Sequence, residues 1–132
     1  MTSIRKATRL DIEGIRTVVK KHWRRIGKWW LNSEALYKAI KRDQVKVLVS
    51  DKTIEAFIVQ RDKRIYAIAT LIKGGGRALL RKCKRGSYAL VSCSNIKAIK
   101  AYESCNFINL GRVKLYVNKE GRWFRLYQKA KF

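Results

Sequence analysis

Three consecutive glycines, Gly74 to Gly76, stand between a β-like run and an apolar helical run in the stretch TLIKGGGRALL. Each glycine inside a helix or strand costs about 0.5–1 kcal/mol relative to alanine. The first turn of a helix offers unpaired N–H groups and a positive dipole end, and glycine lets an anion approach both. The junction fits neither a Walker loop nor GxGxxG. It therefore predicts either a phosphate site or a tight strand–helix turn with a solvated basic face.

A second candidate site is the segment HWRRIGKWW, residues 22–30, where three tryptophans stand among basic side chains. Such aromatic rings can stack on unpaired bases while lysine and arginine hold phosphates. Alternatively the tryptophans close the core between two helices, which is the favoured interpretation for Trp23. The same choice arises for Trp123 and Phe124 near the carboxyl terminus. The candidate nucleic-acid or acceptor residues are Arg24, Arg25, Lys28, Trp29 and Trp30.

The cysteines and the histidine do not form a metal-binding pattern. Cys83, Cys93 and Cys105 are widely spaced and form no CxxC pair, and His22 is the only histidine. The sequence therefore predicts neither a zinc site nor a disulfide framework. The cysteines are expected to be small buried apolar residues in a reducing compartment.

The charge of the chain is extreme, with 32 lysines and arginines against nine acidic residues and a formal net charge of +23. No carboxylate occurs from Lys63 to Tyr102. Self-repulsion of this size favours an anionic partner, and nucleic acid is the commonest one. A basic bias of the whole proteome or a solubility device would give the same charge.

The length of 132 residues and a hydrophobic fraction of 47% fit a single globular domain, residues 1–132. The amino terminus lacks the apolar core of a signal peptide, and no stretch has the length of a membrane span. We expect a cytoplasmic protein that does not bind membranes. A compact, proline-free and very basic chain would suit a virus or mobile element, which would place it in the host cytoplasm.

Hydrophobic periodicity predicts an α/β fold with the order β-α-α-β-β-β-α-β-α-β-β. Alternating strands and helices imply a mixed central sheet with helices on both faces and a right-handed crossover. Asp11 is the expected amino cap of the first helix, the run 64–72 is expected to be buried on both faces, and Ile96, Ile99 and Tyr102 are expected to point inward. The expected strands are 3–8, 45–50, 53–60, 64–72, 87–93, 107–117 and 122–129, and the expected helices are 11–23, 33–42, 77–85 and 95–105.

The segment NIKAIKAYESCNF, residues 95–107, resembles the closing signature N-x-x-A-x-x-x-Y-E-x-x-G-F of the GCN5-related N-acetyltransferases (GNAT). Asn106 stands where that family usually has glycine. The segment RKATRLDIEGIRTVVKKHW also resembles the family's first strand and helix, and the expected element order is similar over nearly the whole chain. The matching residues of the signature are Asn95, Ala98, Tyr102, Glu103 and Phe107.

The resemblance implies an acetyl-CoA site. In that family a loop of the form R/Q-x-x-G-x-G/A binds the pyrophosphate, and Gly74 and Gly76 match its G-x-G step. Leu71 falls where arginine or glutamine is usual, and Lys73 and Arg77 could supply the lost charge. The cofactor-binding residues implied in this way are Leu71, Ile72, Lys73, Gly74, Gly75, Gly76, Arg77, Ala78 and Asn95.

The resemblance also makes Tyr102 the proton donor to the departing sulfur. No glutamate lies on the run 64–72 to act as a base. Glu55 is the nearest acid, and it is interpreted as an ordinary edge carboxylate. The hydroxyls of Ser92, Ser94 and Thr70 are further candidates, because they could order a water.

Three functions remain open. The first is an N-acetyltransferase whose acceptor lies on or near nucleic acid, where a positive surround lowers the pKa of an acceptor amine. The second is suggested by YESCNFINLG, which resembles a stretch of the phage Mom proteins that modify adenine in DNA. The third is a degenerate member of the fold that holds nucleic acid by charge alone.

Overall fold

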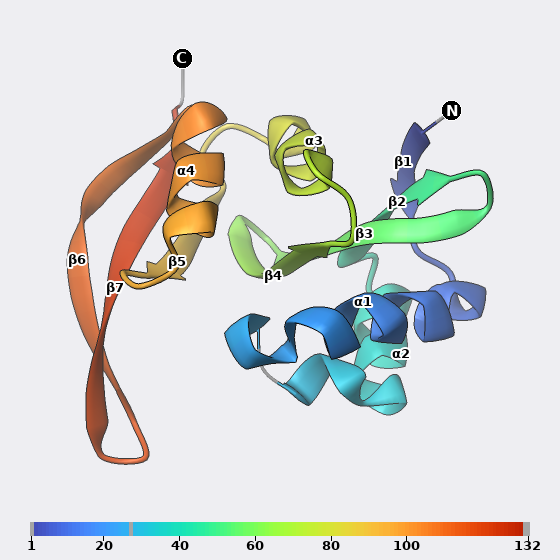
Figure 1. The fold of residues 1–132 in the computed structure, drawn as a ribbon, viewed down its shortest axis with the longest axis horizontal. Coiled ribbons are helices and arrows are strands. Elements are labelled where there is room, and N and C mark those ends of the chain that lie inside the picture. Colours follow the sequence, from blue (N-terminus) through green and yellow to red (C-terminus); the bar gives the residue numbers. More distant parts are fainter. Residues whose placement is uncertain (1, 27, 131–132) are drawn as a thin grey trace.

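A computed structural model describes residues 2–26 and 28–130, and it confirms the predicted order of helices and strands (Figure 1). Two 3-10 turns, Arg9–Asp11 and Lys28–Leu31, precede α1 and α2. The strands are β1 (Thr2–Lys6), β2 (Val45–Ser50), β3 (Thr53–Arg61), β4 (Arg64–Thr70), β5 (Tyr88–Ser92), β6 (Phe107–Val117) and β7 (Glu120–Lys129). The helices are α1 (Ile12–Ile26), α2 (Ser33–Lys41), α3 (Gly75–Lys82) and α4 (Ile96–Ser104).

The seven strands form one mixed sheet in the order β1-β2-β3-β4-β5-β7-β6. Neighbouring strands are antiparallel except β4 and β5, which are parallel. These two strands pair only at Arg64 and Tyr88, near their amino ends. The sheet therefore consists of two antiparallel halves that are joined at one point and separate toward the carboxyl ends of β4 and β5.

Helices cover both faces of the sheet, as expected. Figure 1 shows α1 and α2 on one side of β2, β3 and β4, with α3 on the other side. One core cluster includes Ile15 and Leu36 of the first helix pair together with Phe57 of β3. A second cluster includes Leu79 of α3 and Ile99 of α4. The sheet is thus the middle layer between two apolar cores.

Local details correct three expectations. Helix α3 begins at Gly75, inside the glycine run, because Gly74 adopts the left-handed conformation at its amino cap. The run 64–72 is not buried on both faces, since the ring of Tyr66 is exposed. Ile96 is exposed as the first residue of α4, while Ile99 and Tyr102 are buried as expected.

Asp11 is not the amino cap of α1, which is the fourth correction. It lies at the end of the 3-10 turn that Thr8 caps, and its carboxylate accepts a hydrogen bond of 2.7 Å from the Thr8 N–H. The Arg5 guanidinium donates two further hydrogen bonds to it, of 2.7 and 2.9 Å. The hydrogen bonds from Arg5 are the main cause that lowers the pKa of Asp11, although burial opposes them. This pair of the exposed Arg5 and the buried Asp11 joins β1 to the start of α1.

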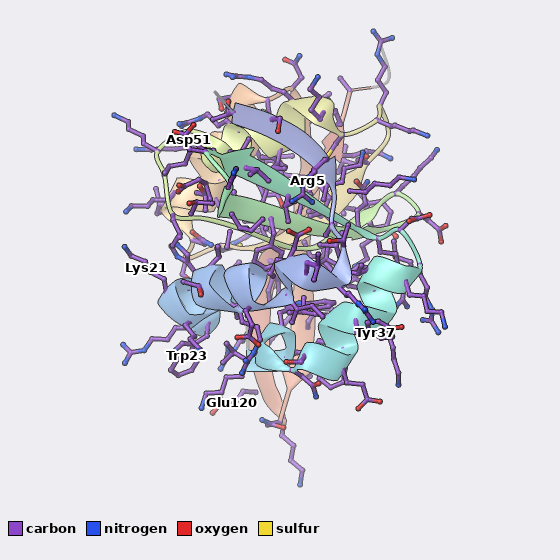
Figure 2. All side chains as sticks on the ribbon, turned by 90° about the vertical axis from the view of Figure 1, so that its right-hand side faces the viewer. Arg5, Lys21, Trp23, Tyr37, Asp51 and Glu120 are labelled. Atoms are coloured by element: carbon purple, nitrogen blue, oxygen red, sulfur yellow. The ribbon has the colours of Figure 1, made fainter. Side chains whose placement is uncertain are left out.

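Basic side chains dominate the surface. Figure 2 shows their blue nitrogen ends on all sides of the ribbon, and the labelled Arg5 and Lys21 come from different elements. The ion pairs among the described residues are mostly exposed, such as the 3.5 Å pair between Lys38 and Glu34. Exposed pairs of this kind contribute little to stability, so most of the positive charge is not neutralised within the chain.

Replacement of Asp11 by asparagine should lower the free energy of unfolding by about 2 kcal/mol near neutral pH, because hydrogen bonds to a charged group are worth about 1.5–3 kcal/mol. A lowered pKa means that the stabilisation is present above the ordinary carboxyl pKa, about 3.9, and is lost as the pH falls through the lowered value. Urea unfolding at a series of pH values measures this loss. The control Asp43→Asn removes an exposed carboxylate 3.7 Å from Lys6 and should change stability by less than about 0.5 kcal/mol. Equal effects of the two substitutions at neutral pH would contradict the prediction.

Candidate functional site

The gap between β4 and β5 is the natural place for a ligand in this sheet. Ligands of open α/β sheets bind outside the carboxyl ends of the strands, where the strand order changes. Here β4 and β5 are parallel and pair only at Arg64 and Tyr88, so both carboxyl ends face the same opening. The separated strand edges can bond an extended chain that carries amide groups.

Each of the three glycines after β4 has its own structural setting. Gly74 has a φ of +82°, a conformation that favours glycine. A β-carbon on Gly75 would overlap the Thr70 hydroxyl. Gly76 has neither constraint, since its φ is not positive and a β-carbon built there meets no heavy atom within 4 Å. The fold itself therefore explains Gly74 and Gly75, and Gly76 keeps the space beside the start of α3 open.

The start of α3 presents backbone donors to that open space. The Gly75 N–H donates to the Ile72 carbonyl at 3.3 Å, and the first amide to bond back within the helical turn is that of Ala78, whose N–H donates to the Gly74 carbonyl at 3.0 Å. The N–H groups of Gly76 and Arg77 precede it, so they have no acceptor within the helix. Lys73 is exposed beside them. Free amides, a helix amino end, an ammonium and clearance at Gly74 and Gly76 fit a diphosphate group.

The other side chains of the predicted cofactor loop already have packing or hydrogen-bond partners within the chain. Leu71 packs against the first core cluster and Ile72 against the second. The Leu71 N–H donates to the Glu55 carbonyl at 2.7 Å. The Arg77 Nε donates to the Ser104 hydroxyl at 3.0 Å and so joins α3 to α4. Phosphate contacts at this loop would come from the backbone and Lys73, and not from residue 71.

The structure also gives partners to the hydroxyls that could order a water. The Thr70 hydroxyl donates to the Ile72 carbonyl at 2.7 Å and accepts from the Ile72 N–H at 3.1 Å. The hydroxyls of Ser92 and Ser94 lie 2.9 Å apart at the end of β5. Thr70 therefore shapes the turn after β4, while the two serines share one hydrogen bond at the opening.

His22 is a candidate functional residue that the sequence analysis missed. Its Nε2 lies 2.7 Å from the carbonyl oxygen of Thr70, at the carboxyl end of β4. Because a carbonyl only accepts, Nε2–H is the donor and the neutral ring keeps a free electron pair on Nδ1. Helical spacing was the available signal, since His22 follows the fully buried Val18 by four residues. The side chain of the only histidine thus reaches the sheet where β4 and β5 separate.

Tyr102 lies within the second core cluster and is only 4% exposed. Its ring meets Phe107 edge-on at a centroid distance of 5.0 Å and stacks on Tyr127 at 5.9 Å. Burial raises the pKa of Tyr102 well above the usual value. No residue in the described part of the chain forms a hydrogen bond with its hydroxyl. The phenol is therefore neutral at physiological pH.

Asn95 caps α4, since its side-chain oxygen accepts the Ala98 N–H at 3.2 Å. It also borders a cavity of about 410 Å³ at the carboxyl end of β5. Its side-chain oxygen is thus held by the helix, and contact with a cofactor stays a prediction for this residue.

The segment that was predicted to bind nucleic acid is divided between two places. Arg24 borders the cavity of about 410 Å³, and Trp29 and Trp30 border another of about 270 Å³ beside Tyr66. Trp29 is 65% exposed, while Trp30 packs against the first core cluster. Trp23 packs there too, with the Lys28 ammonium 4.5 Å from its ring centre. The side chain of Arg25 lies outside the described part of the structure.

Metal-binding clusters and membrane spans are not found among residues 2–26 and 28–130. No three His, Cys, Asp or Glu side chains of this part come together in a group that could hold a metal ion. None of its helices combines the length and apolar character needed to cross a membrane. Cys105 is buried, Cys83 and Cys93 are half-buried, and all three are free thiols.

No family model matches the sequence, and no curated protein matches it significantly. The comparison of structures, in contrast, finds close likeness. A GNAT-family acetyltransferase from Bacillus cereus superposes with a TM-score of 0.78 at 16% identity, over 98% of both chains. A putative acetyltransferase from Salmonella typhimurium, solved with its cofactor acetyl-CoA, gives 0.77 at 15% identity over 100% of this chain and 95% of that one.

An N-acetyltransferase from Thermoplasma acidophilum in complex with coenzyme A gives a TM-score of 0.71 at 16% identity, over 98% of this chain and 99% of that one. Superposition over nearly the whole chain establishes the architecture. Because the sequence identity is low, the chemistry has to be argued from the residues of the site. The similarity to the Mom proteins stays a prediction. The chain has the fold of the GNAT acetyltransferases.

Proposed function

We propose that this protein is an acetyl-CoA-dependent N-acetyltransferase whose acceptor amine is carried on nucleic acid. The observation that supports acetyl-CoA binding is the open space beside Gly76. The fold does not require this space, but a bound diphosphate would require it. When bound, acetyl-CoA supplies a thioester whose acetyl carbon bonds to the amine nitrogen as its carbon–sulfur bond breaks. Two protons then have to move, one from the amine and one to the sulfur.

Backbone and side-chain groups of this chain would bind and orient such a cofactor. The N–H groups of Gly76 and Arg77, with the Lys73 ammonium, would hold the diphosphate at the start of α3. The unpaired edges of β4 and β5 would bond the amide groups of the extended arm. A cofactor held in this way would have its thioester near the carboxyl ends of the two strands, where His22 contacts the Thr70 carbonyl.

His22 and Tyr102 are the groups that would move the protons. Nδ1 of His22 would accept the proton of the acceptor amine, while Nε2–H stays bonded to the Thr70 carbonyl. The Tyr102 hydroxyl would give its proton to the sulfur, since burial raises its pKa and keeps it protonated. The two residues reach the sheet from opposite faces.

Gly76→Leu should weaken acetyl-CoA binding about tenfold or more, because the added side chain would cover the amides of the α3 amino end. The folded chain should tolerate it, since a β-carbon at Gly76 meets no atom within 4 Å and leucine favours helix over glycine. Calorimetric titration in moderate salt measures the affinity, with tripolyphosphate as a control polyanion. Gly76→Ala is the matched control, and it should keep most of the affinity.

Acetyl-CoA that binds the unaltered chain no better than tripolyphosphate would contradict the proposed activity. The chain would then be a nucleic-acid-binding member of the fold. Gly75→Ala serves as a different comparison, because its overlap with the Thr70 hydroxyl should lower thermal stability as well as affinity.

His22→Gln and Tyr102→Phe should each lower kcat. His22→Gln should lower it about 100-fold, because glutamine keeps the donor to Thr70 and loses the base. Tyr102→Phe should lower kcat at all pH values below the raised pKa of the phenol. Both variants should keep the affinity for acetyl-CoA. An unchanged kcat in His22→Gln would remove His22 from the reaction.

The β6–β7 hairpin supports the proposal that the acceptor is carried on nucleic acid. Figure 1 shows this hairpin projecting well beyond the body of the fold. On one of its faces Trp123 is 47% exposed and Tyr116 is 70% exposed. The Arg112 guanidinium lies 5.1 Å from the Trp123 ring centre, and the Lys114 ammonium lies 5.5 Å from that of Tyr116. Alternating rings and cations on an exposed ribbon suit stacking of unpaired bases and contacts to phosphates.

Trp123→Ala should weaken binding of a single-stranded oligonucleotide about tenfold, because stacking on one base is worth about 1–3 kcal/mol. The slope of log affinity against log salt should stay the same, since no phosphate contact is lost. Fluorescence anisotropy at several salt concentrations measures both quantities. Tyr37→Ala removes an exposed ring of α2 and should have no effect. Equal losses from the two substitutions would contradict a role of the hairpin.

A further inference from the structure

The cavity of about 410 Å³ lies where four elements meet at the carboxyl end of β5. Arg24 comes from the last turn of α1, Ser92 ends β5, Lys97 lies in the first turn of α4, and Arg122 comes from β7. Its size is within the range of about 300–1,000 Å³ that is usual for small-molecule sites. Because β4 and β5 are parallel, this cavity opens at the same end of the sheet as His22.

The charged groups around this cavity are all positive. None of the described residues that line it is acidic. Arg122 has an ion pair with Glu120 at 3.9 Å, but both side chains are more than 60% exposed. The Arg24 guanidinium lies 5.6 Å from the ring centre of Trp23, and Lys97 is exposed. Three cations around one hollow repel each other, and an anion between them would relieve that repulsion.

Two further features of the lining define what kind of anion fits. The hydroxyls of Ser92 and Ser94 lie 2.9 Å apart, and both can donate to phosphate oxygens. Phe124 of β7 is half-buried and brings an aromatic ring to the same wall. Cations with hydroxyls suit a phosphate, and the ring offers a flat surface for a nucleobase.

We propose that this cavity is the acceptor site, and that it selects acceptors that carry a phosphate beside an amine-bearing ring. The inference rests on the proposed function and narrows its substrate class. Polyamines and other polycations are excluded, because like charges at Arg24, Lys97 and Arg122 oppose them. The phosphate belongs either to a free nucleotide or to a nucleic-acid strand, and both present the same chemistry to the cavity.

Calorimetry on the full chain with cytidine 5′-monophosphate (CMP), cytidine, spermidine and a short single-stranded oligonucleotide tests this proposal. The variant Lys97→Gln/Arg122→Gln removes two charges from the cavity. The control Lys41→Gln/Arg42→Gln removes two exposed charges at the end of α2, so the net charge of the two proteins is the same. CMP affinity should fall about tenfold in the first variant and less than about twofold in the second. Cytidine and spermidine should bind neither protein measurably.

The results separate the two sources of phosphate. A tenfold loss for CMP and the oligonucleotide together supports a strand as the acceptor, and a loss for CMP alone supports a free nucleotide. Equal losses in the two variants would overturn the proposal, since they would reflect the overall charge. Binding of cytidine as strong as that of CMP would also overturn it.

Titration of CMP in the presence of coenzyme A distinguishes the test of the acceptor cavity from the test of acetyl-CoA binding. Saturating coenzyme A should leave CMP binding intact, and displacement would show that CMP occupies the cofactor site, which would overturn the inference. Lys97→Gln/Arg122→Gln should keep the acetyl-CoA affinity of the unaltered chain. Acetyl-CoA that fails to bind any of these proteins would overturn the proposed function, while the CMP titrations would still report on the cavity.

Discussion

The single pairing of β4 with β5 at Arg64 and Tyr88 is the constraint on which the rest of the structure depends. If the two strands paired along their whole length, the sheet would be closed and its carboxyl ends would offer no opening. With one pairing, the two halves are held together by side chains as well, and the second core cluster contains Ile65 of β4 together with Val91 of β5 and Tyr127 of β7. The glycine turn, His22 and the cavity of about 410 Å³ all lie on or near the carboxyl side of this separation.

A chain with so few carboxylates has to stabilise its basic side chains in other ways. The Lys129 ammonium donates to three carbonyls at the end of α3, at 3.0, 2.9 and 2.7 Å, those of Leu80, Arg81 and Cys83. A cation at a helix carboxyl end is favourable, and here it holds β7 against α3. Elsewhere cations lie over rings, as Arg64 does over Tyr66 at 4.6 Å. These contacts need no acid, and they leave the positive charge of the side chains in place.

Local sequence could predict the elements and the glycine turn, because their signals lie within a few residues. Even the departure from the family signature follows a local rule. Asn106 has a φ of +66° after α4, and asparagine tolerates this left-handed conformation better than most residues other than glycine. Glu103 of the same signature accepts the hydroxyl of the buried Tyr127 at 2.9 Å, which is a contact between distant strands and helices.

The parts that sequence could not predict depend on contacts between distant residues. His22 and Thr70 are 48 positions apart, and the cavity lining comes from α1, β5, α4 and β7. Periodicity shows which face of a helix is apolar, but it does not show which strand end that helix crosses. The predicted burial of both faces of β4 was wrong for a related reason, since the Tyr66 ring is exposed and the guanidinium groups of Arg61 and Arg64 lie over it.

The absence of a glutamate on β4 has a physical reason in this setting. A carboxylate among so many ammonium and guanidinium groups would be paired and its pKa lowered, so it would be a weak proton acceptor. A neutral imidazole forms no ion pair with those cations, so one of its nitrogens stays available when the other is held by a neutral partner. The Thr70 carbonyl is such a partner for His22, and it belongs to the backbone, so it cannot be drawn into an ion pair. Under the proposed function, a histidine held on a strand end therefore keeps a free acceptor nitrogen where a carboxylate would be paired with a neighbouring cation.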